Sequence, residues 1–298
     1  MIRVSTEQTT LDALAGINTA YNQVTTSQQQ LETGYRINQP SDDPAGTTQA
    51  LQIKTSLLQL GQFQKNINSA QSFMNTSDTA LGQINTLLDQ AKSIAVQGGS
   101  NTLSSDQSAA LAAQIQGIMD QVAELGNTMN GTQYVFGGQM TNQPPFVSNN
   151  GSYTYNGGTS ANNSDQINVD FAPGQTMQIN VSGESAIQPI FGVLSQLKSD
   201  LQFGNASAIS NNDISAIDSQ LSQVESAQAD VGAKLQTLSS TSQYSQLEQT
   251  NYQNYLSQIM DTNMAQAVVT LQSAQTAYQA ALAAASNTFQ QSLLNYIK

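Results

Sequence analysis

Two adjacent carboxylates, Asp42 and Asp43, are the residues in this chain that most directly suggest chemistry. A pair of neighbouring acids can act as a general acid and base, or it can hold a divalent cation. These two stand directly before Pro44, and acids before a proline are a common way to begin a helix. We therefore interpret them, with Ser41, as candidate helix-capping residues. A catalytic or metal-binding pair is the alternative.

Other catalytic chemistry finds little support in the composition. The chain contains no His and no Cys, so it lacks the commonest general base, imidazole ligands, thiolates and disulfides. No glycine-flanked serine elbow occurs, and a Ser–Lys pair is the remaining combination of nucleophile and base. Tyr153 and Tyr155 could belong to a carbohydrate site, although an exposed β segment that only covers the surface is the simpler interpretation. We predict no enzyme activity, no cofactor and no metal.

The two acids lie in a connector between two predicted helices. Gly34 follows a segment of periodic apolar residues and suits the left-handed position that ends a helix. Pro44 suits the first position of the next helix, where no amide hydrogen is missed. The predicted connector residues are Gly34, Arg36, Asp42, Asp43 and Pro44.

Both ends of the chain carry apolar residues at alternating spacings of three and four, which indicates coiled-coil helices. The N-terminal seam also includes Gln28 and Tyr35. The C-terminal seam begins after the register shifts between Ile259 and Met264. The residues predicted to support self-assembly are Leu14, Ile17, Tyr21, Val24, Leu31, Val268, Leu271, Tyr278, Leu282, Phe289 and Leu293.

These terminal segments are nearly uncharged. No charged residue lies between Asp12 and Glu32, and none lies between Thr262 and Ile297. A solvated helix usually carries charge, and a membrane helix would not keep so many amides, so each helix is expected to be surrounded by other protein. Ordering a residue costs about 1–2 kcal/mol, and few side chains here are large enough to offset that cost. We predict that both ends are disordered in the monomer and become ordered on assembly.

The middle of the chain predicts a helical bundle that carries a small β insertion. A long helical pattern runs from Pro44 to about Gln97, and Ser104 with Gln107 forms a capping-box signature for the next helix. Alternating apolar residues flank Pro173-Gly174, as in a β-hairpin. The predicted fold class is mainly α with a small β insertion, a long antiparallel helical bundle or coiled coil built from the N- and C-terminal halves.

This pattern divides the chain into three predicted domains. The terminal coiled-coil helices comprise residues 1–45 and 256–298, the helical bundle comprises 46–136 and 187–255, and the small β domain comprises 137–186.

The net charge of -12 argues against a nucleic-acid partner. No cleavable signal peptide and no membrane-spanning stretch are visible in the sequence, so we expect neither a Sec-type leader nor membrane insertion.

Several segments resemble the flagellin superfamily. The N-terminal motif is carried by residues 31–38 (LETGYRIN) and 42–46 (DDPAG), and it continues in 66–71 (NINSAQ) and Ala80-Leu81. At the other end, residues 265–268 (AQAV) and 292–297 (SLLNYI) are similar to the C-terminal motif. The resemblance covers both terminal regions, well over half of the chain, and the β insertion adds little to it.

Within the superfamily, three details resemble the junction proteins between hook and filament more than the filament subunits. They are Pro40 where flagellins usually carry Ala, the aromatic-glycine segment 134–138 (YVFGG), and the C-terminal ending. The chain departs from the family in its small β insertion and in the Gln residues that replace charges on the helices. A flagellin-type filament subunit is the alternative.

The resemblance implies an axial, structural protein of the bacterial flagellum. It implies export through the flagellar type III channel with an export chaperone, and self-assembly into a ring or helix at the tip of the hook. The implied partners are other copies of the chain, hook-associated protein 1 below and flagellin above. The terminal helices would form an inner layer around the channel, with the bundle outside them and the β insertion on the surface.

Overall fold

The computed structural model describes residues 2–100, 103–149, 151–160 and 165–297, with the side chains of 2–7 and 288–297 left aside. The chain forms two compact units. The terminal unit contains the residues up to Gln59 and those from Leu247 onward, and the central unit contains Leu60–Gln246. The fold is mainly α with small antiparallel hairpins, which confirms the predicted fold class. The finer division into three domains stays a prediction.

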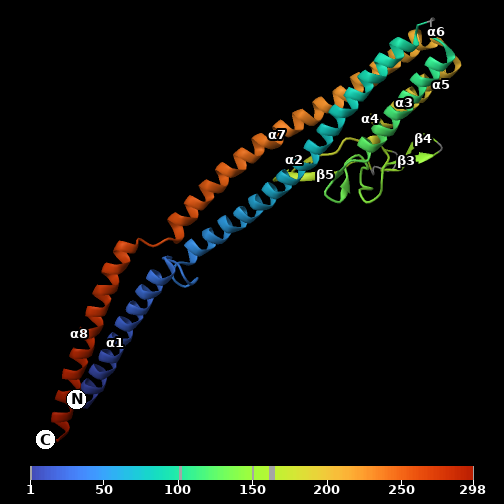
Figure 1. Ribbon diagram of the computed structural model, residues 1–298. Helices are drawn as coiled ribbons and strands as arrows, with labels where there is room; N and C mark the ends of the chain where they lie inside the picture. Colours follow the sequence, from blue (N-terminus) through green and yellow to red (C-terminus); the bar gives the residue numbers. More distant parts are fainter. Residues whose placement is uncertain (1, 101–102, 150, 161–164, 298) are drawn as a thin grey trace. The chain divides into compact units, whose positions relative to one another are not determined.

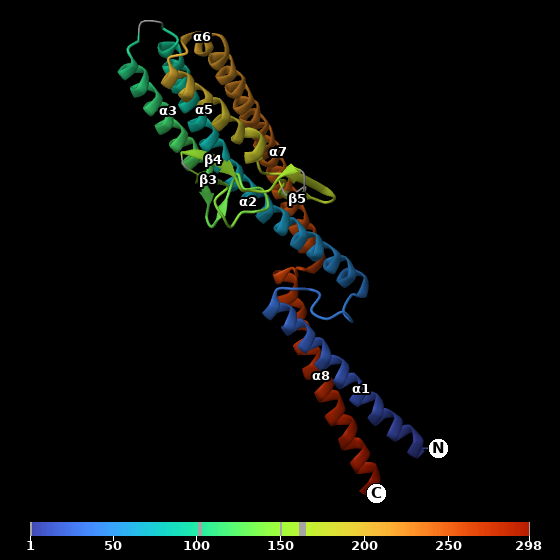
Figure 2. The ribbon, with the colours of Figure 1, turned by 90° about the vertical axis from the view of Figure 1, so that its right-hand side faces the viewer.

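The terminal unit is built around a pair of helices from opposite ends of the chain. Helix α1 (Ile2–Thr33) and helix α8 (Met264–Ile297) lie side by side, and the N- and C-termini lie at the same end of the pair (Figures 1 and 2). The two helices are therefore antiparallel. The same unit holds the first turns of α2 (Pro44–Gly98) and the last turns of α7 (Ile214–Met260).

The central unit is a helical bundle. It contains α3 (Ser105–Gly126), α5 (Gln188–Phe203) and the rest of α2 and α7. The short helices α4 (Gly183–Ala186) and α6 (Ala206–Ala208) flank α5, and a π-helical turn, η2 (Ile209–Asp213), leads into α7. Figure 2 shows α3 and α5 alongside α2 and α7.

Polar contacts between α2 and α7 show that these helices run antiparallel in the central unit. Gln64 Nε2 donates to Ser242 Oγ at 2.8 Å, and Asn85 Nδ2 donates to Gln228 Oε1 at 3.2 Å. A salt bridge of 2.6 Å joins Lys92 to Asp218. Positions further along α2 thus meet positions further back along α7, as the predicted bundle of two chain halves requires.

One hydrophobic core fills the central unit. Apolar side chains of α2, α3, α5 and α7 are buried together, among them Ile67, Leu81, Leu88, Ile115, Ile190, Leu194, Leu197, Ile217 and Val224. These positions recur at the spacings of three and four that a buried helix face requires. The capping box at the start of α3 is confirmed, because Ser104 and Gln107 bond each other's backbone reciprocally.

The β insertion consists of short hairpins. Strands β1 (Met129–Asn130) and β2 (Gln133–Tyr134) pair with each other, as do β3 (Phe146–Asn149) and β4 (Ser152–Tyr155), and β5 (Asn168–Ala172) and β6 (Gln175–Gln178). Residues 173–174 form the predicted connection of the last hairpin, with Gly174 at φ 68°. Phe146, Phe171 and Ile179 are buried in the same core as the helices, so the hairpins depend on the bundle for burial.

The structure contains no membrane-spanning candidate among its described residues, because none of those helices combines the length and the apolarity that a bilayer crossing needs.

Candidate functional site: a connector that joins two terminal helices

The connector has the helix-ending and helix-starting geometry that the sequence predicts. Gly34 adopts φ 75°, and its N–H donates to Gln30 O at 3.0 Å. Helix α2 begins at Pro44, and the N–H of Gly46 donates to Asp43 Oδ1 at 2.8 Å, so Asp43 is the N-cap.

Asp42 has a different role from the capping role that we considered for it. Its Oδ2 accepts hydrogen bonds from the N–H groups of Asn38 at 3.0 Å and Gln39 at 2.9 Å. Asp42 therefore shapes the loop before α2, while its neighbour caps the helix. Both carboxylates are engaged by backbone N–H groups, which supports the structural interpretation of the pair over the catalytic one.

Arg36 links the connector to the C-terminal end of α7. Its Nη2 donates to Asp43 Oδ2 at 3.1 Å and to the main-chain oxygen of Ile259 at 2.9 Å. The backbone N–H of Gly46 and the guanidinium of Arg36 hold the pKa of Asp43 below its usual range. A cation at the last carbonyls of a helix is also favoured by the helix dipole.

The backbone of the connector also pairs with a short strap, residues 261–263, between α7 and α8. The N–H of Arg36 donates to Met260 O at 2.6 Å, the N–H of Thr262 donates to Gly34 O at 2.9 Å, and Tyr35 forms an antiparallel bridge with Asp261. Segments more than 200 residues apart in the sequence are thereby joined.

The strap is the part of the site that our sequence reasoning missed. The shift of the apolar register after Ile259 is visible in the sequence, but a complete break of the helix does not follow from it. Asn263 provided a further signal, because its Oδ1 accepts a 3.2 Å hydrogen bond from Gln266 N–H at the start of α8. An Asn before an apolar helical segment is a typical N-cap.

The inner faces of α1 and α8 combine larger apolar residues with small ones. On α1, Ile17, Val24 and Leu31 are half-buried, as are Leu271 and Tyr278 on α8. The most deeply buried positions of the pair are small, namely Ser27, Ala267, Ala274 and Ala285. Our sequence reasoning passed over most of these small residues because an alanine carries little apolar signal, yet small side chains allow two helices to approach closely.

Four of the predicted self-assembly residues point away from this inner face. Leu14, Tyr21, Val268 and Leu282 are 45%, 55%, 55% and 43% exposed. Tyr21 still touches the partner helix at its edge, where its ring lies 5.9 Å from that of Tyr278. Phe289 and Leu293 belong to the part of α8 whose side chains lie outside the described residues. We call Leu14, Tyr21, Val268 and Leu282 the outer stripe.

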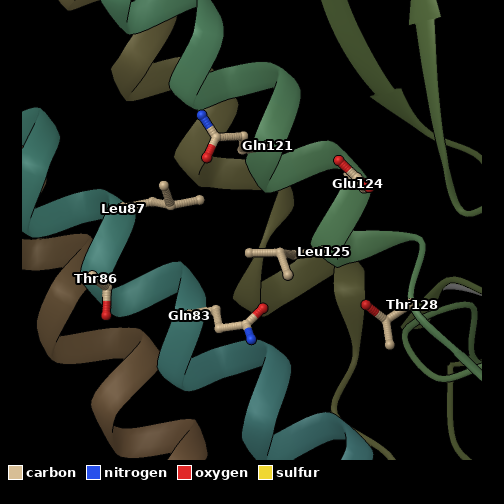
Figure 3. Close-up of a pocket in the computed structure, with 7 residues that line it drawn as sticks. All are labelled: Gln83, Thr86, Leu87, Gln121, Glu124, Leu125 and Thr128. Atoms are coloured by element: carbon tan, nitrogen blue, oxygen red, sulfur yellow. The ribbon is translucent and has the colours of Figure 1, made fainter.

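The central unit offers a groove, but its lining does not suggest catalysis. A groove of about 490 Å³ lies between α2 and α3, and Figure 3 shows its lining residues Gln83, Thr86, Leu87, Gln121, Glu124, Leu125 and Thr128. Glu124 is the one ionisable residue in this lining, and the Thr86 hydroxyl donates to Gly82 O at 3.1 Å. Across the described residues, no cluster of three or more acidic side chains could hold a metal ion.

Comparison with known proteins agrees with the terminal motifs. Residues 4–141 match the N-terminal helical region of bacterial flagellin, and residues 214–297 match its C-terminal helical region. Flagellar hook-associated protein 3 of Salmonella typhimurium is 31% identical over 153 residues, 51% of this chain and 48% of that protein. The chain thus spans about half the length of the curated relatives it matches.

Solved structures share the fold. Flagellar hook associated protein-3 from Legionella pneumophila gives a TM-score of 0.62 at 16% identity, covering 70% of this chain and 98% of that one. FlgL from Bacillus cereus gives a TM-score of 0.59 at 21% identity, covering 69% and 99%. Because residues 4–141 and 214–297 match the two helical regions of bacterial flagellin and together make up most of the chain, the chain belongs to the bacterial flagellin family.

Proposed function

We propose that the chain is a structural subunit of the bacterial flagellum, placed at the junction between the hook and the filament. The observation that carries the proposal is the 31% identity over 153 residues to a flagellar hook-associated protein 3. A filament subunit of the flagellin type is the second candidate, because the matched family regions are those of flagellin itself.

The exposed apolar residues of the terminal unit support an assembly role. The outer stripe leaves four large apolar side chains between about two-fifths and three-fifths exposed on an almost uncharged helix pair. Exposed apolar surface of this kind is typical of a protein–protein contact. In our proposal, neighbouring copies of the chain cover the stripe, and the terminal helices become fully ordered when they assemble.

The proposed partners are those that a subunit at the hook–filament junction would contact. Hook-associated protein 1 lies below the ring of subunits and flagellin lies above it. An export chaperone holds the chain before it passes through the flagellar type III channel. The terminal helices form the inner layer around that channel, where amide and hydroxyl side chains hold a passing unfolded chain weakly.

The proposed role is structural and requires no catalysis. The family is one of structural flagellar proteins, and Glu124 is the one ionisable residue in the lining of the described groove. We propose that the chain is not an enzyme and that its self-assembly and connector residues carry its function.

The test is complementation of a bacterium from which the gene has been deleted. Tagged chain is located on purified flagella by immunogold electron microscopy. We expect a single gold cluster at the hook–filament boundary, whereas gold along the whole filament would identify a filament subunit. Failure to find the chain on flagella at all would refute the proposal.

Substitution in the outer stripe tests the mechanism in the same strain. Leu14→Ser with Val268→Ser should abolish incorporation and leave the central unit folded. Phe203→Ser is the matched control, because Phe203 is 79% exposed but belongs to the central unit. We expect the control to incorporate normally. Normal incorporation of the double variant would show that the outer stripe is not an assembly surface.

A further inference from the structure

The inner faces of α1 and α8 repeat almost identically every seven residues. On α1, small residues stand at positions 13, 20 and 27 and larger apolar residues at 17, 24 and 31. On α8, alanines stand at 267, 274 and 281, with Leu271 and Tyr278 between them. Sliding one helix along the other by seven residues therefore places small residues against the same kinds of neighbours as before.

Charge does not select among these alignments. Helix α8 carries no charged residue from Met264 to Ile297, so a slip creates no repulsion and breaks no ion pair between the two helices. The ring contact between Tyr21 and Tyr278 is also replaceable, because a slip of seven residues brings apolar Leu14 beside Tyr278. In coiled coils, a unique alignment usually depends on a charged or polar residue within the seam.

The connector and the strap supply contacts that exist in one alignment alone. The bonds from Arg36 N–H to Met260 O and from Thr262 N–H to Gly34 O tie the residues that follow α1 to the end of α7 and to the strap that precedes α8. The Arg36 guanidinium adds its bonds to Ile259 O and Asp43. A slip of seven residues, about 10 Å along a helix, would break this set.

We propose that Arg36 and the strap 261–263 form a register-setting clamp, which selects one alignment of α1 and α8 from several that their inner faces allow. Arg36 is in this sense a positioning residue. The clamp also determines how the outer-stripe residues of α1 are aligned with the outer-stripe residues of α8. Its importance for assembly rests on the proposed function, whereas its effect on alignment does not.

The alignment can be read by disulfide trapping, because the chain has no cysteine of its own. Two contacts show which residues of the helices lie opposite each other: the hydrogen bond from Thr262 N–H to Gly34 O and the ring contact between Tyr21 and Tyr278. Counting along the antiparallel helices from either contact places Val24 opposite Ala274 to within about two residues. The aligned pair is therefore Val24→Cys with Ala274→Cys. The slipped pairs combine Val24→Cys with Ala267→Cys or with Ala281→Cys, one heptad away in either direction.

The full-length chains are oxidised under assembly conditions, and the disulfide-linked peptides are measured by mass spectrometry. Isotope-labelled and unlabelled chains are mixed so that links within one chain can be separated from links between chains. Because a disulfide needs Cα atoms within about 7 Å, only residues that lie level can form it. In the otherwise unaltered chain we expect the aligned pair to form the dominant link within the chain.

Substitution of the clamp should release the alignment. Arg36→Ala removes two hydrogen bonds from a charged donor and should reduce the preference for the aligned pair by about tenfold or more. Thr262→Pro removes the N–H that bonds to Gly34 O and should act in the same direction. Arg36→Lys should restore part of the preference, and Lys54→Ala, which removes a charge outside the clamp, should leave it unchanged.

Each outcome decides the inference. An unchanged preference for the aligned pair in both Arg36→Ala and Thr262→Pro would overturn it. Equal yields of all three pairs in the unaltered chain, or no link within the chain at all, would also overturn it. Incorporation into flagella is scored separately. An unaltered chain that is absent from flagella would refute the proposed function and leave the trapping result intact.

Discussion

The carboxyl groups of Asp200 and Asp213 lie within hydrogen-bonding reach of each other inside the central unit. Asp200, near the end of α5, is 5% exposed, and Asp213, at the end of the π-helical turn, is 3% exposed. Asp200 accepts hydrogen bonds from Gln196 Nε2 at 2.7 Å and Asn205 Nδ2 at 2.9 Å. Burial, followed by the negative charge of Asp200, raises the pKa of Asp213 to about 6. The pair is thus arranged to hold one proton.

This pair should make the central unit more stable at pH 5 than at pH 7.5. A pKa raised in the folded state contributes stability that is complete below the unfolded value of 3.8 and is lost as the pH rises through about 6. Asp213→Asn should remove this dependence and increase the free energy of unfolding at pH 7.5, on the order of 1–3 kcal/mol. Urea denaturation followed by circular dichroism between pH 5 and 8 measures both effects.

Asp218→Asn is the control for that experiment, because Asp218 is about half exposed and forms a salt bridge with Lys92. Its replacement should change the free energy of unfolding by less than about 1 kcal/mol and leave the pH profile unchanged. A wild-type profile that is flat between pH 5 and 8 would show that the two aspartates do not share a proton.

Truncation of a core residue should destabilise the central unit strongly. Leu194 is 0% exposed in the middle of α5, and Leu194→Ala should lower the free energy of unfolding by about 2–5 kcal/mol. Phe203→Ala, at the 79% exposed end of the same helix, should change it by less than about 0.5 kcal/mol. Equal effects of the two substitutions in urea denaturation would contradict the assignment of the core.

Two glycines of the central unit should respond in opposite directions to alanine. A Cβ at Gly183 would lie 2.6 Å from Phe136 O and 2.8 Å from Tyr155 Cε2, so Gly183→Ala should destabilise the unit by about 1–3 kcal/mol. A Cβ at Gly232, inside α7, would meet nothing within 4 Å. Gly232→Ala should stabilise the helix by about 0.5–1 kcal/mol. Thermal unfolding of both variants gives the comparison, and the same sign for both would contradict it.

The features that the sequence predicted well depend on a few neighbouring residues. The capping box at Ser104 and Gln107, the left-handed Gly34 and the hairpin at Pro173-Gly174 follow from backbone conformations that these residue types favour. The antiparallel bundle follows from the apolar spacing of its helices together with their lengths.

The features that the sequence did not reveal depend on contacts between distant segments. The spacing that groups Leu14 with Ile17 does not show which of them faces α8, because that choice depends on small residues such as Ala267 and Ala274. The partners of Arg36 lie more than 200 residues away. The approach of Asp200 to Asp213 likewise requires the turn between α5 and α7. This turn is π-helical, and no local sequence pattern predicted that geometry.

Amide hydrogen exchange, compared between the free chain and assembled flagella, tests the central claim most directly. We predict that residues before about 40 and after about 260 exchange at unfolded rates in the free chain and become protected on assembly. The central unit should be protected in both states. If α1 and α8 are already fully protected in the free chain, the terminal helices do not depend on neighbouring copies for their order, and the proposed mechanism of assembly is contradicted.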